Sequence, residues 1–290
     1  MNYEPKYSVL AYGGPGVGKT ATLVSAFWDW KNKVQVADGR LITFGRENNP
    51  ALGLPNELRM AGPHSLRFSA PSLDNLDWLS KFEDVVDGLL LNAQKGNCLD
   101  VLVVDGMTEF DLLFEAAWQN VKTGDKWDKF DDLLNRCFAA MFRLDHEALN
   151  CLVMVTARVM EKKKSKQAGN KSIAGDPSYI NFDYYPSMRG SFKLHFPHYF
   201  NLVLYMETRM MRVTEGERQG QHLPAHVLSM ARTGEFYVKN QWESDWLRAG
   251  YPLELVNPMW PGVHDMLVAS MTKENDGTII EETGELVDEV

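Results

Sequence analysis

The chain is poor in cysteine and has no long hydrophobic run. Of its 290 residues only three are cysteines, Cys98, Cys137 and Cys151, and they form neither a CxxC pair nor a cluster with histidine. This spacing argues against a disulfide framework and against a zinc site. No apolar segment approaches the roughly 20 residues of a membrane-spanning helix, and the polar start of the chain is unlike a signal peptide. We therefore expect a cytoplasmic protein without a membrane partner.

Positive charge is also scarce, because 30 basic residues face 39 acidic ones and leave a net charge of −9. Residues 273–290 hold seven carboxylates and one lysine, so this end alone accounts for −6. The balance argues against a uniformly basic nucleic-acid coat but allows a local basic patch. We expect residues 273–290 to form an acidic, disordered tail, which serves solubility or occupies a basic surface of the protein.

Short apolar runs that do not alternate in polarity recur along the chain. They comprise residues 7–12, 41–44, 101–104, 152–155 and 202–205. Such runs are typical of strands covered on both faces in a parallel sheet. Segments with helical spacing lie between them, at 21–30, 73–92, 109–121 and 130–149. Strands that alternate with helices predict an α/β fold with βαβ crossovers.

The pattern changes beyond residue 205. Residues 226–231 and 235–239 are shorter, alternating segments separated by a turn, which predicts antiparallel strands at the edge of the sheet on its C-terminal side. We expect a core over residues 1–250, a helical or irregular segment over 251–272, and the acidic tail over 273–290.

A glycine-rich loop follows the first predicted strand and precedes a predicted helix. It matches the pattern GxxxxGKS/T at every fixed position, with Gly13, Gly14, Pro15, Gly16, Val17, Gly18, Lys19 and Thr20. The backbone N–H groups of such a loop converge on phosphate oxygens. Lys19 would neutralise the β- and γ-phosphates of ATP, and the Thr20 hydroxyl would coordinate Mg²⁺. The alternative is a glycine-rich turn without a ligand.

Asp105 follows the apolar run 101–104 directly. Because the carboxyl ends of parallel strands converge near the nucleotide, this carboxylate is expected to contact Mg²⁺ directly or through a water. The alternative is an N-cap for the helix that follows, where aspartate is common.

Residues from about 7 to about 245 resemble the RecA-like P-loop ATPases, particularly the phage-encoded ones grouped with recombination and single-strand annealing proteins. The resemblance rests on the glycine-rich loop, which is a Walker A motif, on Asp105, and on segments at 41–50, 151–158, 159–189 and 186–241. It implies a RecA-like core, a DNA-stimulated ATPase with ATP and Mg²⁺ as cofactors, and the host cytoplasm as location for a phage protein. The implied partners are single-stranded DNA, further copies of the chain in a ring or filament, and other recombination or replication proteins.

The resemblance assigns catalytic roles to Glu47 and Lys239. Glu47 follows the strand 41–44 and matches the glutamate that activates the attacking water, a position suited to a general base. Lys239 matches the lysine that reaches a neighbouring subunit's γ-phosphate, while Gln241 replaces the second cation often found there. The alternatives are a surface loop residue for Glu47 and an ordinary edge-strand lysine for Lys239.

Thr156 and Arg158 end the segment 151–158, where the family senses the γ-phosphate. Relatives usually have Asn-Gln or Thr-x-His at this point, so Arg158 is a departure. Two partners remain open for its guanidinium, a phosphate or DNA.

The segment 159–189 occupies the place of the family's second DNA-binding loop. Its basic residues are Lys162, Lys163, Lys164, Lys166 and Lys171, which together with Arg158 and Glu161 give a local charge of +5. Lysines bind a nucleic-acid backbone by displacing its counterions, and the tyrosines and phenylalanine at 179–185 are suited to stacking on unpaired bases. The alternative is a solvated loop whose aromatic residues pack under the sheet.

The leading hypothesis is an ATPase that binds single-stranded DNA and supports recombination, annealing or repair. Two others remain. The first is a nucleotide-switched protein-interaction module with little hydrolysis. The second is a small-molecule or nucleotide kinase, with the lysine-rich segment as its lid.

Overall fold

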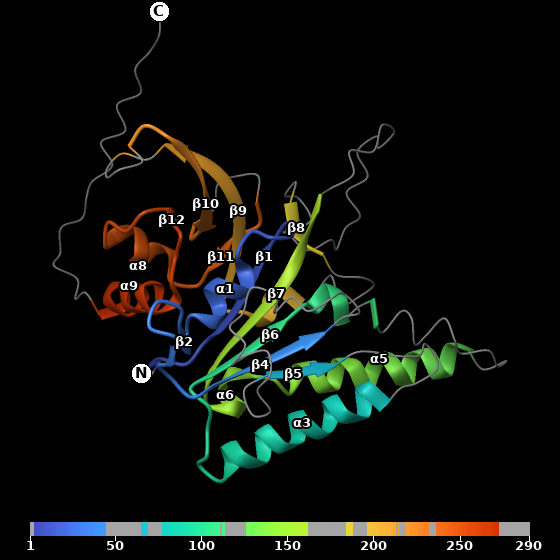
Figure 1. Ribbon diagram of the computed structural model, residues 1–290. Helices are drawn as coiled ribbons and strands as arrows, with labels where there is room; N and C mark the ends of the chain where they lie inside the picture. The colour runs from blue at the N-terminus through green and yellow to red at the C-terminus, as the bar shows by residue number, and fades with distance from the viewer. Residues whose placement is uncertain are drawn as a thin grey trace, which may run out of the picture.

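The protein has an α/β fold in which helices and antiparallel strands flank a mostly parallel central sheet (Figure 1). The computed structural model describes residues 3–44, 65–68, 77–110, 112–113, 126–161, 184–187, 196–212, 214, 219–231 and 236–272. Within these ranges the sheet has the strand order β12-β10-β9-β1-β7-β6-β4-β5.

The strands have the following bounds: β1 Ser8–Gly13, β2 Trp28–Asp29, β3 Val34–Gln35, β4 Gly39–Phe44, β5 Ser65–Phe68, β6 Val101–Asp105, β7 Leu152–Glu161, β8 Tyr184–Pro186, β9 Leu202–Arg212, β10 His222–Ser229, β11 Lys239–Asn240 and β12 Glu254–Val256. The helices are α1 Lys19–Val24, α3 Asp77–Gln94, α5 Lys126–Phe142, α6 His146–Leu149, α8 Glu243–Arg248 and α9 Trp260–Thr272, with a short 3-10 helix at Phe196–Tyr199.

All five predicted parallel strands are present and buried. The strands β9, β1, β7, β6, β4 and β5 run parallel to one another. Leu10, Val103, Met154 and Leu204, one from each of four of these strands, are fully buried. The strand β7 stands between β1 and β6, so the glycine-rich loop after β1 and Asp105 at the end of β6 open onto the same edge of the sheet.

Antiparallel strands extend the sheet beyond β9, as the sequence predicts. β10 pairs with β9, and β12 pairs with β10. The strand predicted over 235–239 is shorter in its described part, residues 236–239, where Lys239 begins β11 and pairs, together with Asn240, with the start of β9. Phe236 instead makes an isolated bridge to Tyr184, and the side chains of Tyr184 and Phe236 pack together.

Two predicted helices end earlier than the spacing of their apolar residues predicts. The helix predicted over 21–30 ends at Val24, because Phe27 turns inward against Gly39, where an added Cβ would lie 2.3 Å from the Phe27 ring. The helix predicted over 130–149 divides into α5 and α6. Asp145 has an extended backbone there and caps α6 by accepting a hydrogen bond from Glu147 N. Tertiary packing and a local cap decide these ends.

The segment 251–272 contributes β12 and α9, and α9 packs against α1 and α8. Trp260 N donates a hydrogen bond to Ser25 Oγ over 2.7 Å, and the Tyr7 hydroxyl bonds to His264 Nδ1 over 2.9 Å. The two clusters of helices are visible in Figure 1, with α1, α8 and α9 beside β1 and β12 and with α3, α5 and α6 below β4 and β5. No described helix combines the length and apolar character needed to cross a membrane.

Candidate functional site

The glycine-rich loop leaves β1 at the carboxyl end of the sheet, and its glycines are required by geometry. A Cβ on Gly13 would lie 2.0 Å from the carbonyl oxygen of Met206 on the adjacent strand β9. Gly16 and Gly18 have φ angles of 72° and 86°, the left-handed region that L side chains rarely adopt. The loop therefore has a backbone course that other residues at these three positions would disturb.

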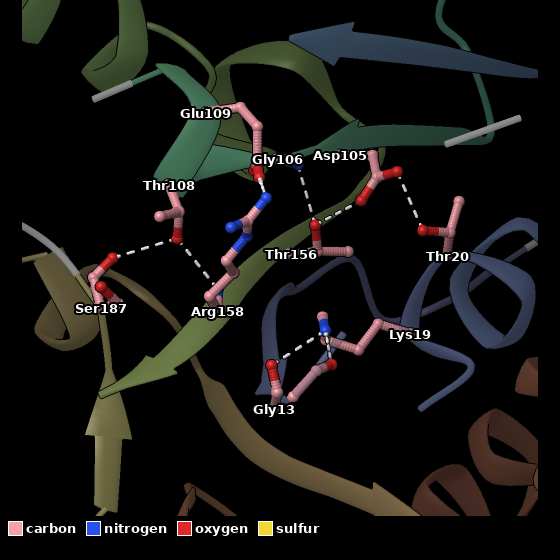
Figure 2. Close-up of polar contacts among 11 residues, drawn as sticks. Gly13, Lys19, Thr20, Asp105, Gly106, Thr108, Glu109, Thr156, Arg158 and Ser187 are labelled. Atoms are coloured by element: carbon pink, nitrogen blue, oxygen red, sulfur yellow. Dashed lines mark hydrogen bonds and ion pairs between the residues drawn. The ribbon is translucent and has the colours of Figure 1, made fainter. Parts of the chain in front are cut away.

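Lys19 is folded back over the loop that precedes it. Its Nζ donates hydrogen bonds to the carbonyl oxygens of Gly13 at 3.0 Å and Gly14 at 2.6 Å (Figure 2). Burial lowers the pKa of Lys19 to about 8, against the opposing influence of the Asp105 and Glu109 carboxylates. The ammonium group is thus hydrogen-bonded to neutral carbonyl oxygens inside the loop. A negatively charged partner would stabilise this partly buried charge better.

Thr20 and Asp105 meet across the edge of the sheet although 85 residues separate them in sequence. The Thr20 hydroxyl donates to Asp105 Oδ2 over 2.8 Å, and the Thr156 hydroxyl donates to Asp105 Oδ1. Gly106 N in turn donates to Thr156 Oγ1 over 2.9 Å. Asp105 is only 6% exposed. Its two oxygens are fixed by hydroxyl groups from α1 and β7, which favours the predicted metal-site role over a helix cap.

The residues present fit a magnesium ion. A buried carboxylate and a hydroxyl from separate elements are hard oxygen donors, and Mg²⁺ is commonly held by one or two such groups while it keeps several waters. The described residues contain no group of three or more histidines, cysteines, aspartates and glutamates that could hold a metal ion. The candidate is the oxygen pair of Thr20 and Asp105, whose side chains are hydrogen-bonded at the end of the glycine-rich loop.

Arg158 and Glu109 form an ion pair beside this centre, as Figure 2 shows. Arg158 lies three residues before the end of β7, and Glu109 lies in the helical turn after Asp105. Their charges act in opposite directions on the pKa of Lys19, which the Glu109 carboxylate raises and the Arg158 guanidinium lowers. No sequence motif predicts Glu109. Its position four residues after Asp105, at the start of a helix, is the signal that points to it.

The backbone of Arg158 is tied to neighbouring elements. Arg158 N donates to Thr108 Oγ1 over 2.9 Å, the Thr108 hydroxyl donates to the Ser187 carbonyl over 3.2 Å, and Ser187 N donates to the Arg158 carbonyl over 2.7 Å. In sequence, residues 158 and 187 lie on either side of the lysines at 162–171, and residues 159–186 are here called the lysine-rich segment. Both ends of that segment are therefore connected to the strand and helix that carry Asp105 and Glu109.

Lys239 lies away from the loop of its own chain. It pairs with Val203 near the start of β9, whereas Gly13 pairs with Met206, three residues further along the strand. Its Nζ donates to the carbonyl oxygens of Phe200 at 2.6 Å and His198 at 3.1 Å, and burial lowers its pKa. A role at a neighbouring subunit's phosphate stays a prediction.

Several predicted site residues lie outside the described residues. These are Glu47 and the lysines Lys162, Lys163, Lys164, Lys166 and Lys171, so their roles stay predictions. Of the nearby aromatic residues, Tyr185 is buried with its hydroxyl on Met160 Sδ, and Tyr184 packs on Phe236. These two tyrosines take part in packing, the alternative to base stacking.

The sequence matches no protein-family model, and no match to a curated protein was found. The geometry of the site and the sequence motifs are therefore the grounds for a functional proposal.

Proposed function

We propose that this protein binds and hydrolyses ATP with Mg²⁺ as a RecA-like P-loop ATPase that acts on single-stranded DNA. The observation that carries the proposal is the hydrogen bond from Thr20 to Asp105, made beside Lys19 in the glycine-rich loop. Nucleotide hydrolysis needs a phosphate cradle, a cation and a metal site at one point. Lys19 would supply the cation, and Thr20 and Asp105 would supply the metal site, at the mouth of the loop.

Residues 13–20 would hold the phosphates, with Thr20 and Asp105 on Mg²⁺. The metal ion supplies charge neutralisation at the transferred phosphoryl group. Lys19 would exchange the carbonyl oxygens of Gly13 and Gly14 for phosphate oxygens, so its charge gains a stronger partner on binding. Thr156 keeps the Asp105 carboxylate oriented through its hydroxyl.

The attacking water needs a general base, and Glu47 is our candidate for it. Glu109 is a second carboxylate near the loop, but it is paired with Arg158. A terminal phosphate that drew Arg158 away would release Glu109 as well, so the two glutamates have to be separated by experiment. Arg158 would then stabilise negative charge on the phosphoryl group.

Two observations support the RecA-like assignment and the DNA partner. The strand β7 lies between β1 and β6, and antiparallel strands continue the sheet beyond β9. The hydrogen bonds among Arg158, Thr108 and Ser187 connect the candidate phosphate-sensing residue to both ends of the lysine-rich segment. A nucleotide that favoured one arrangement of Arg158 would thereby favour one arrangement of the DNA-binding segment.

The deciding experiment measures phosphate release from ATP with and without single-stranded DNA. We expect Mg²⁺-dependent turnover that DNA increases and that Lys19→Ala abolishes, with Lys81→Ala, on the exposed face of α3, as the matched control. Tight ATP binding without turnover would favour a nucleotide-switched interaction protein. Phosphoryl transfer to a nucleoside monophosphate instead of water would identify a kinase.

A further inference from the structure

The side chain of His226 lies against Gly18, at the C-terminal end of the glycine-rich loop. An added Cβ on Gly18 would be 2.9 Å from His226 Cδ2, 3.0 Å from Cγ and 3.2 Å from Nδ1. Three ring atoms at nearly equal distances mean that the loop backbone faces the flat side of the imidazole. His226 comes from β10, more than 200 residues along the chain, and no sequence motif includes it.

The strand that carries His226 is held at this position by several contacts. His226 N donates to Asn257 Oδ1 over 2.9 Å, and Asn257 N donates to the His226 carbonyl over 2.6 Å. The ring Nδ1 also lies 3.4 Å from Thr208 Oγ1 of β9. The imidazole is therefore partly exposed but held in position by its contacts.

The order of the strands gives the loop two different sides. Asp105, Thr156 and Arg158 come from β6 and β7, on one side of β1. His226 comes from β10, which lies beyond β9 on the opposite side of β1. A nucleotide whose terminal phosphate met Asp105 and Arg158, and whose phosphate chain followed the loop across β1, would have its ribose and base on the side of β9 and β10.

From this arrangement we propose that His226 contacts the nucleoside half of the bound nucleotide and contributes to the discrimination between ATP and bare polyphosphate. The inference rests on the proposed nucleotide binding and adds a residue to it. The part of the imidazole that is turned away from Gly18 and stays exposed offers a surface for a base or sugar. Ring stacking on a base is a substantial and sequence-tolerant contribution to affinity.

The test compares two ligands that share the phosphate chain and differ in the nucleoside. Binding of Mg·ATP and of inorganic tripolyphosphate is measured by calorimetry for the wild type, His226→Ala and His226→Phe. We expect His226→Ala to weaken ATP binding roughly tenfold, to leave tripolyphosphate affinity within about twofold, and His226→Phe to restore most of the ATP affinity because it keeps a planar ring. His222→Ala, on the same strand and exposed, is the matched control.

The outcomes distinguish failure of the His226 inference from failure of the proposed nucleotide binding. Equal weakening of both ligands in His226→Ala would reduce His226 to a support for the loop and overturn the inference, as would unchanged ATP affinity. In both cases the proposed function would still stand if the wild type binds ATP and Lys19→Ala does not. If the wild type binds neither ligand, the proposed function fails and the inference fails with it. Far-ultraviolet circular dichroism of each variant verifies that it is folded.

Discussion

The hydroxyl of Thr20 and the carboxylate of Asp105 are joined by a hydrogen bond of 2.8 Å, which connects the start of α1 to the end of β6. Each residue alone is common in proteins without a nucleotide. Their contact at the mouth of a glycine-rich loop is what distinguishes this edge of the sheet, since two side-chain oxygens from distant parts of the chain meet there.

The first prediction concerns this pair. Asp105→Asn keeps the size of the side chain and removes the negative charge, so we expect Mg²⁺-dependent turnover to fall on the order of 100-fold or more. Thr20→Val should act in the same direction, whereas Thr20→Ser retains the hydroxyl and most of the rate. Steady-state assays over a magnesium titration provide the measurement. Normal magnesium dependence in Asp105→Asn would place the metal ion elsewhere.

The second prediction follows from the pKa of Lys19, which burial lowers to about 8. A bound triphosphate stabilises the ammonium and raises this pKa, so ATP binding above pH 8 must take up a proton. Affinity should therefore decrease as the pH rises from 8 to 9.5. Calorimetry at pH 8.5 in two buffers of different ionisation enthalpy measures the uptake directly. Lys19→Arg stays charged and should bind ATP without proton uptake, which makes it the control.

The third prediction separates the two glutamates. Glu47→Gln should reduce turnover by about 10²- to 10⁴-fold with ATP binding retained, as expected for loss of a general base. Glu109→Gln removes the partner of Arg158, and we expect a change in turnover within about fivefold, because the Arg158 side chain is 41% exposed and such pairs are weak. The reverse ranking in single-turnover experiments would assign the base to Glu109.

The fourth prediction concerns DNA. Replacing Lys162, Lys163 and Lys164 by alanine should weaken binding of single-stranded DNA and reduce the slope of log affinity against log salt by about 2, at roughly 0.7 for each lost phosphate contact. Fluorescence anisotropy with a labelled oligonucleotide over a series of salt concentrations gives both quantities. An unchanged slope would mean that these lysines are a solvated loop.

The fifth prediction concerns the acidic tail. Deletion of residues 273–290 removes a net charge of −6, so DNA affinity should rise, most strongly at low salt where the electrostatic competition is least screened. Affinity that does not change with the deletion would leave solubility as the role of the tail. ATP binding by the shortened chain is the control for folding.

The sheet could be predicted from sequence because its strands are continuous apolar runs, as at Val101–Val104, and both of their faces are buried. The ends of helices could not. α1 stops where Phe27 packs on Gly39, a contact that no local pattern encodes, and the interruption between α5 and α6 depends on the backbone of Asp145.

The site shows the same division. Lys19, Thr20 and Asp105 follow a motif whose residues have fixed spacing or end an apolar strand, so the sequence predicts them together. Glu109 and His226 belong to no motif. They reach the loop through the pairing of strands and the turn after Asp105, which only the folded chain reveals.

The contacts of Asn257 and Trp260 have a consequence for how the protein unfolds. Asn257 holds the strand of His226, and Trp260 is bonded to Ser25 just beyond α1. We therefore expect the last described helix and the glycine-rich loop to open together and not independently. The backbone amides of α9, which is far in sequence from the glycine-rich loop, should exchange with deuterium more slowly when a nucleotide is bound. Proteolytic cleavage of the chain before residue 254 should abolish that protection.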